Sequence, residues 1–315
     1  MRRKSYSAPM LFGLQFFRLC LCLFLLAGAT VQVRAADLAL VLSDAGGVYG
    51  EFATSLQHYL QGSAWRVRWT GAVESLDPAA AQADLLIAVG SEAARVCVRR
   101  GEGRPIIATL LPRQAFERIA SELGRTRAPL TAITLDQPLT RQIAFLRTIL
   151  PEKTRLGLLT GADSRNLLAQ VRQAASQSGL TLESEDVDTD ESLVTALGQL
   201  FNRSDVLLAL PDTGIYRRDN VRTVLLTSFR HQKPVIGFSQ AFVTAGALAA
   251  LFSSPAQIAR QTAELLKQTP AEPVTLPAPQ SPTYFSLAIN RSVAQSLGLN
   301  LPDEAAVRRR LGADR

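Results

Sequence analysis

Cysteine is scarce in this 315-residue chain, and the positions of its three cysteines exclude a framework of disulfides. Cys20 and Cys22 lie within an apolar N-terminal run, where they serve as hydrophobic residues. Cys97 lies in a predicted helix between Val96 and Val98, which indicates a buried and unreactive thiol. The folded protein must therefore draw its stability from burial, which a composition of 47% hydrophobic residues can supply.

Histidine is equally scarce, and the sequence contains no recognisable catalytic or metal-binding motif. His58 and His231 are the only two histidines, and neither has a catalytic or ligand partner at a recognisable spacing. A Gly-x-Ser-x-Gly nucleophile elbow, a Walker Gly-Lys-Ser/Thr sequence and a Gly-x-Gly-x-x-Gly fingerprint are all missing. We therefore expect no enzymatic activity, no cofactor and no metal. An exported enzyme of the same fold class is the alternative, and it would require a reactive residue in its cleft.

The net positive charge comes mostly from the N-terminus. Five basic and no acidic residues fall within residues 1–35, so the formal charge drops from +7 for the whole chain to +2 without them. The remaining basic cluster, Arg308 to Arg310, is typical of a solvated terminal helix. Because a nucleic-acid partner would need clustered positive charge on the folded surface, we expect none.

The first 35 residues have the order of a secretory signal peptide. Basic residues 2–4 precede an apolar run at 19–29, and residues 33–35 place small side chains where a signal peptidase cleaves. The apolar run is shorter than the roughly 20 residues that a membrane-spanning helix needs. We therefore predict export to the periplasm, with cleavage after Ala35 or Ala36.

Apolar runs of strand length alternate with amphipathic segments of helix length through the rest of the chain. One set extends from a strand at 38–42 to a fifth strand at 130–134, and a second set begins with a helix at 140–150. Fully apolar strands that alternate with helices are typical of parallel sheets covered on both faces. The sequence thus predicts an α/β protein with two doubly wound parallel-sheet lobes. Residues 270–282 hold five of the 16 prolines and predict an extended crossing between the lobes.

Candidate ligand-binding residues follow the predicted strands, because open parallel sheets bind ligands beyond the carboxyl ends of their strands. Asp44 or Asp212 could pair with an ammonium group of a ligand, and the amides of Gly90-Ser91 could bind a carboxylate. The rings of Tyr49 and Tyr216 could stack on a flat ligand or pack in the core. Serine and aspartate at such positions are also ordinary helix caps, so both roles stay open. The predicted site consists of Ser43, Asp44, Tyr49, Gly90, Ser91, Leu111, Thr160, Ser164, Asp212, Thr213, Tyr216, Ser239 and Gln240.

Several segments resemble one family of binding proteins, the ABC-transporter substrate-binding proteins of the tryptophan/tyrosine-binding type. The most specific similarity is to the second lobe of that family. It is carried by LLALPDT at 207–213, KPVIG at 233–237 and VTAGAL at 243–248. Further similar segments are DLLIAVGSEAA at 84–94, LPEKTRLGLL at 150–159 and the ending around 289–302.

This resemblance implies the type I periplasmic-binding fold, with three crossings between the lobes and closure around a small ligand, often an aromatic amino acid. It implies that the ligand is bound without chemical change and that the partner is the membrane permease of an ABC transporter. A ligand-sensing subunit that reports to a membrane receptor is the alternative on the same fold. We expect a monomer.

The predicted domain boundaries divide the chain between the two lobes. Lobe one is expected at 37–134 plus 246–272, and lobe two at 135–245 plus 273–289. A C-terminal helical segment is expected at 290–315, packed on lobe two. Hinge strands are expected near residues 135, 245 and 273.

N-terminal sequencing of the exported protein should return Ala36 or Asp37 as the first residue, because the basic, apolar and small-residue regions stand in signal-peptide order. A first residue of Met1, or a lipidated cysteine at the new N-terminus, would contradict this prediction.

Overall fold

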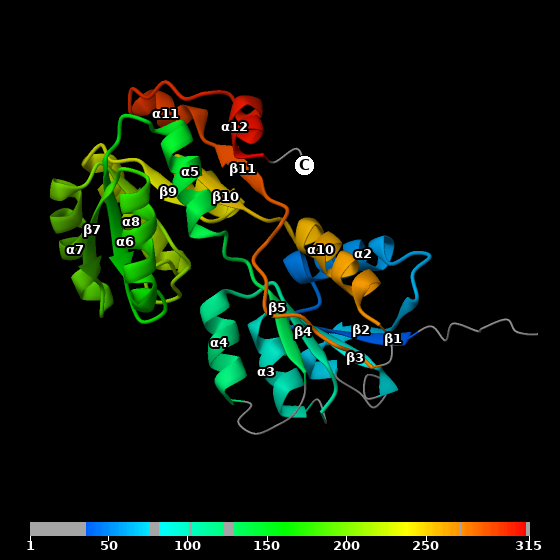
Figure 1. The fold of residues 1–315 in the computed structure, drawn as a ribbon. Coiled ribbons are helices and arrows are strands. Elements are labelled where there is room, and N and C mark those ends of the chain that lie inside the picture. Colours follow the sequence, from blue (N-terminus) through cyan, green and yellow to red (C-terminus); the bar gives the residue numbers. More distant parts are fainter. Residues whose placement is uncertain (1–35, 76–81, 101–102, 123–128, 271–272, 313–315) are drawn as a thin grey trace, which may run out of the picture. The chain divides into compact units, whose positions relative to one another are not determined.

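The computed structural model of the chain describes residues 36–75, 82–100, 103–122, 129–270 and 273–312. These residues form two β-sheets with helices packed on them (Figure 1). The predicted signal peptide lies outside these residues. Within the described ranges, no helix is both long enough and apolar enough to cross a bilayer.

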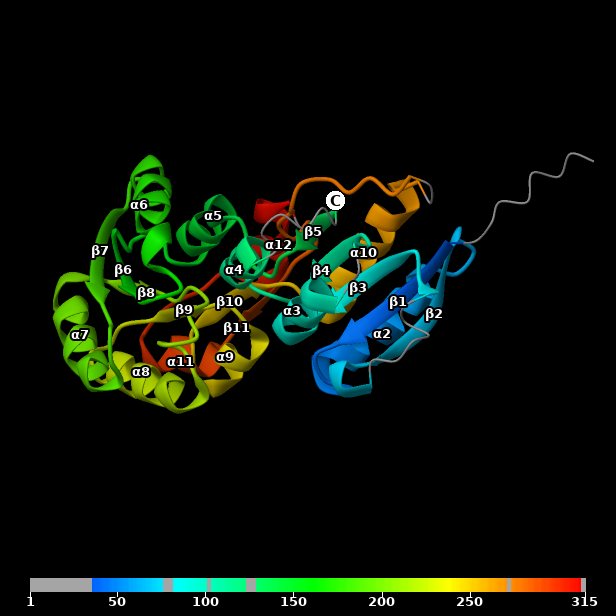
Figure 2. The same cartoon turned by 90° about the horizontal axis from the view of Figure 1, so that it is seen from below.

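Sheet A has five parallel strands in the order β2-β1-β3-β4-β5, with β2 and β5 at its edges (Figure 2). Alternate side chains of its central strands face opposite ways. Leu38 and Leu40 pack towards one pair of helices, whereas Ala39 and Val41 pack towards the other pair. The strands are β1 (Ala36–Leu42), β2 (Trp65–Ala72), β3 (Leu85–Val89), β4 (Ile106–Thr109) and β5 (Leu130–Ile133).

Helices cover both faces of sheet A. On one face, α2 (Gly47–Tyr59) and α10 (Pro255–Gln268) pack against each other (Figure 1). On the other face lie α3 (Ser91–Arg100) and α4 (Arg113–Glu122). Because both faces are buried, every residue of β3 and β4 is buried. In the sequence these strands are therefore nearly unbroken runs of apolar residues, without the alternation of apolar and polar residues seen in half-exposed strands. A short 3-10 helix, η1 (Val73–Ser75), follows β2.

Sheet B has six strands in the order β11-β10-β9-β8-β6-β7, of which β10 and β11 are antiparallel and the other neighbours parallel. Figure 2 shows α5 and α6 on one side of this sheet and α7, α8 and α9 on the other. The strands are β6 (Arg155–Thr160), β7 (Thr181–Asp186), β8 (Val206–Leu208), β9 (Val235–Gly237), β10 (Ala249–Phe252) and β11 (Ser286–Ile289).

The helices around sheet B form its two cores. Those of the first core are α5 (Leu139–Ile149), α6 (Leu168–Gln177), α11 (Arg291–Ser296) and α12 (Glu304–Leu311), with the short η3 (Arg165–Leu167). Those of the second are α7 (Asp190–Arg203), α8 (Arg218–Arg230) and α9 (Gln240–Ala245). The C-terminal α12 packs on α5, and its Val307 is fully buried in the first core. The two lobes, each built on a parallel or mostly parallel sheet covered by helices, confirm the predicted α/β fold class.

The lobe boundaries in the structure differ from the predicted ones at two segments. Residues 249–252, expected in lobe one, belong to sheet B, because β10 lies between β9 and β11. Residues 273–281, expected in lobe two, pack against lobe one instead. Val274 and Leu276 pack on its core, and Gln280 forms a parallel bridge with Ile133. The chain therefore crosses after β5, after β10 and before β11, which corrects the expected hinges near 245 and 273.

Cys97 should resist thiol reagents in the native protein, because its side chain is 1% exposed and burial raises the pKa of the thiol to about 12. Labelling of the mature protein at neutral pH should be negligible before unfolding and complete in denaturant. Rapid labelling of the folded protein would show that the helix α3 opens.

Candidate functional site

A cavity of about 330 Å³ is lined by residues at the carboxyl ends of strands from both sheets. Leu110 follows β4, Leu135 follows β5, and Phe238 follows β9. The first turn of α2 contributes Val48 and Tyr49, while the crossing after β10 adds Ser253 and Pro255. The walls are mostly apolar, and the location agrees with the rule that ligands bind beyond the carboxyl ends of parallel strands.

Three predicted site residues meet at the end of β1. Ser43 accepts a hydrogen bond from the backbone N–H of Ala93 at 2.9 Å, so its hydroxyl caps α3. Gly90 has a φ of +94°, and a Cβ there would lie 2.5 Å from Ser43 Oγ and 2.7 Å from the Tyr49 ring. Glycine therefore permits Ser43 and Tyr49 to approach closely, and Tyr49 lines the cavity.

The remaining predictions in lobe one have ordinary structural contacts. The Asp44 carboxylate accepts the backbone N–H of Gly46 at 2.9 Å in an exposed turn. Ser91 is the half-buried first residue of α3. Leu111 is fully buried in the core under α3 and α4, and its neighbour Leu110 lines the cavity instead.

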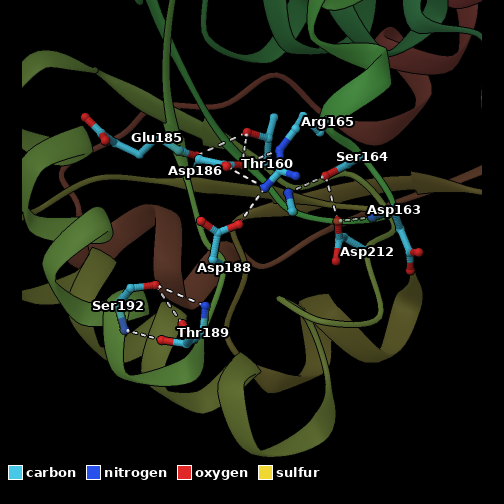
Figure 3. Close-up of polar contacts among 11 residues, drawn as sticks. Thr160, Asp163, Ser164, Arg165, Glu185, Asp186, Asp188, Thr189, Ser192 and Asp212 are labelled. Atoms are coloured by element: carbon cyan, nitrogen blue, oxygen red, sulfur yellow. Dashed lines mark hydrogen bonds and ion pairs between the residues drawn. The ribbon is translucent and has the colours of Figure 1, made fainter.

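In lobe two, the Asp212 carboxylate connects two loops (Figure 3). One oxygen accepts from the Ser164 hydroxyl at 2.7 Å and from the backbone N–H of Asp163 at 3.2 Å. The other oxygen accepts from the backbone N–H groups of Gly214 at 3.0 Å and Ile215 at 3.2 Å. These four donors fill the carboxylate, which is 4% exposed. The contacts favour the capping interpretation of Asp212, and contact with a ligand stays a prediction without support from this geometry.

Asp163 extends this loop network to lobe one. Thr213 donates both its hydroxyl, at 2.5 Å, and its backbone N–H, at 3.1 Å, to the Asp163 carboxylate. Arg118 of α4 forms an ion pair with the other oxygen at 2.5 Å. Although burial acts to raise it, hydrogen bonds from Thr213 and Arg118 hold the pKa of Asp163 below its ordinary value. A second polar contact of α4 is the 2.7 Å hydrogen bond from Gln114 to Asn166.

Thr160 is also engaged within lobe two. Its hydroxyl donates to Asp186 at 3.0 Å, and Arg165 pairs with both Asp186 and Asp188 (Figure 3). The Arg165 guanidinium lowers the pKa of Asp186. Thr160 therefore supports the end of β7 rather than the 330 Å³ cavity, since it is not among the lining residues.

The last three predicted residues lie near α9. Ser239 caps α9 by accepting the backbone N–H of Phe242 at 3.2 Å, and it lines the cavity. Gln240 is exposed. Tyr216 packs edge-on against Phe238 and Phe242, and its buried hydroxyl has no hydrogen-bond partner among the described residues. Burial raises the pKa of Tyr216. Its ring thus belongs to the aromatic cluster behind the cavity wall.

Asp136 is the residue that sequence reasoning missed. It follows β5 and is the only ionisable acid or base, apart from the tyrosine hydroxyl, among the cavity-lining residues. Burial raises the pKa of this carboxyl, opposed by hydrogen bonds from the backbone N–H groups of Arg113 and Asp136 itself. Ligands bind in the loops at the carboxyl ends of parallel strands. The same rule, applied to the loop after β5, would have identified Asp136 as a candidate.

A second cavity of about 530 Å³ shares Asp136, Gln137, Gln142 and Pro211 with the first and extends between α4 and α6. Its lining is more polar and includes Arg113 and several glutamines. Among the described residues, no group of three or more His, Cys, Asp or Glu side chains could hold a metal ion. The lining of the first cavity offers apolar surface, hydrogen-bonding side chains and the Asp136 carboxyl.

A family model described as "ABC transporter substrate binding protein" matches residues 77–310. The chain belongs to this family. Members are binding proteins that act outside the cytoplasm, so a small-molecule ligand and a membrane ABC permease are the partners of this substrate-binding protein. A comparison with curated proteins finds no match.

Solved structures show the same fold at low sequence identity. A conserved domain protein from Vibrio cholerae is 19% identical with a TM-score of 0.60, covering 88% of this chain and 98% of its own. An ABC domain from Streptococcus pneumonia, in complex with L-Trp, is 17% identical with a TM-score of 0.60, covering 87% and 98%. A ligand-free, open substrate-binding protein with adhesive properties from Clostridium difficile is 14% identical with a TM-score of 0.64, covering 85% and 96%. The substrate-binding protein thus has the type I periplasmic-binding fold.

Replacing Asp212 with Asn should destabilise the protein, because an amide cannot accept from donors on both of its sides. We expect Asp212→Asn to lower the free energy of unfolding by about 1–3 kcal/mol, which lowers Tm by roughly 2–4 °C per kcal/mol. Asp44→Asn is the matched control, since Asp44 accepts a single exposed N–H and should change stability by less than about 0.5 kcal/mol. An unchanged Tm combined with lost ligand binding would return Asp212 to the ligand-contact role.

Proposed function

We propose that this protein binds a small, largely apolar metabolite, with aromatic amino acids among the candidates, and delivers it to an ABC permease. The observation that supports the proposal is the 330 Å³ cavity, whose apolar lining comes from both lobes. Its volume lies within the range of about 300–1,000 Å³ usual for small-molecule sites. A ligand in this position would contact both sheets at once and so favour one arrangement of the lobes over others.

Aromatic side chains support a ligand with a flat apolar part. Tyr49, Phe238 and Phe252 line the cavity, and the Phe238 ring is held edge-on against Tyr216. Rings fixed in this way offer apolar area at a low cost in conformational entropy. The Streptococcus protein of the same fold is in complex with L-Trp, which is consistent with an aromatic ligand here.

The family match supports transport rather than the sensing alternative. The signal-peptide order of residues 1–35 supports a periplasmic location. Burial of Cys97 leaves the described part of the chain without an accessible thiol, which suits an oxidising compartment.

A thermal-shift screen of the mature protein against amino acids and aromatic metabolites should identify a ligand. A compound at 100 times its Kd should add about 2.7 kcal/mol of stability, which raises Tm by several degrees. Tyr49→Ala should then weaken that ligand by about 1.5 kcal/mol, or roughly tenfold, because the lost ring contributes apolar area to the cavity.

Tyr59→Ala is the control, because Tyr59 lies in the same helix and packs on the same core without lining the cavity. Equal losses of affinity in the two variants would mean that the effect comes from α2 rather than from the site. No stabilising compound in the whole screen would contradict the proposed function.

A further inference from the structure

We propose that Asp136 is the group that recognises an ammonium of the ligand, so that the cavity selects apolar amines over apolar carboxylates. This inference rests on the proposed function, because it names the ligand chemistry of the same site. It differs from the sequence prediction, which assigned an ammonium partner to Asp44 or Asp212.

The lining of the cavity carries a single ionisable carboxyl and no base. No Lys, Arg or His lines it, and Asp136 contributes the only formal charge. Arg113 lines the neighbouring cavity and donates to the Ser281 hydroxyl at 3.2 Å. A ligand carboxylate would therefore meet no cationic side chain in the lining and would stand in the same cavity as a carboxylate.

The amide and hydroxyl side chains of Gln137, Gln142 and Ser253 in the lining are already engaged with the protein. Gln137 donates to the Ser253 hydroxyl at 2.8 Å and accepts from Arg141 at 2.8 Å. Ser253 in turn donates to the backbone carbonyl of Tyr284 at 2.5 Å. The Gln142 amide donates to the backbone carbonyl of Gln137 at 3.3 Å. These groups have little capacity left for a ligand, in contrast to Asp136.

Asp136 keeps capacity for a ligand. Its Oδ2 accepts the backbone N–H of Arg113 at 2.5 Å, and no ion pair joins it to any residue that the structure describes. Burial raises the pKa of Asp136, and the Arg113 guanidinium acts to lower it without forming a direct ion pair with the carboxylate. A half-buried carboxylate without a direct ion pair is costly in an apolar setting, and an ammonium group entering the cavity would offset that cost. Charge-assisted hydrogen bonds of this kind are stronger than neutral ones.

The competing role of Asp136 is structural, because its bond to the Arg113 N–H lies at the first residue of α4. Asp136→Asn separates the two roles. The Asn side-chain carbonyl can still accept the Arg113 N–H, since Asn and Asp cap helices equally well, but the charge is lost. Asp303→Asn is the matched control, because Asp303 caps α12 through the backbone N–H of Ala306 and does not line the cavity.

The test uses matched compounds that differ in one group. Calorimetry at neutral pH compares phenethylamine, 2-phenylethanol, 3-phenylpropionate and L-phenylalanine, with the corresponding indole series for a larger ring. The native protein should bind the amine at least tenfold more tightly than the alcohol and the carboxylate. Asp136→Asn should weaken the amine by about 10- to 100-fold, leave the alcohol unchanged and leave the Tm of the free protein unchanged. L-phenylalanine binding that also falls in Asp136→Asn would support the proposal.

Three results would overturn the inference while the proposed function stands. They are equal affinity for amine and alcohol, a preference for the carboxylate, and unaltered amine affinity in Asp136→Asn. If no member of either series binds or stabilises the native protein, the proposed function for aromatic ligands fails together with the inference.

Discussion

Burial of both faces of each sheet is the constraint on which the rest of this protein depends. A strand covered by helices on both sides is apolar along nearly all of its length, as β3 and β4 are. Strands joined by a helix that packs on the same sheet run parallel. Parallel strands bring their carboxyl ends to one edge of the sheet. The loops at that edge are the places where polar side chains can gather without disturbing the core, and the cavity is lined from these loops in both sheets.

The polar residues of these loops divide into two groups. In one group, side chains such as Ser164, Asp163 and Asp212 bond to one another and to neighbouring N–H groups, so they hold the loops in place. In the other group, the side chains of Tyr49 and Asp136 face the cavity with few internal partners. A rigid frame of satisfied polar groups around a few unsatisfied ones is the arrangement that preorganises a binding site.

The sequence predicts the fold better than it predicts the site, for a physical reason. Fold class follows from apolar runs of strand and helix length, which require no knowledge of side-chain direction. Whether a loop residue lines a cavity depends on direction alone, as Leu110 and Leu111 show, since one lines the cavity and the other is buried in the core. The role of Asp212 depends on partners from a loop about 50 residues away. The residues of β10 were expected in lobe one because these four apolar residues stand just before the helix α10, which packs on sheet A.

The three crossings between the sheets also constrain how the chain can fold. Sheet A is flanked by α10, which follows ten strands in the sequence, and sheet B receives its last strand, β11, only at residues 286–289. Neither lobe is a continuous stretch of chain. Lobe one is completed only after most of lobe two has been made, and lobe two is completed only when β11 follows. Contacts between residues so distant in sequence form slowly, because loop closure must precede them. A chain that emerges N-terminus first therefore stays incompletely folded until nearly all of it is present.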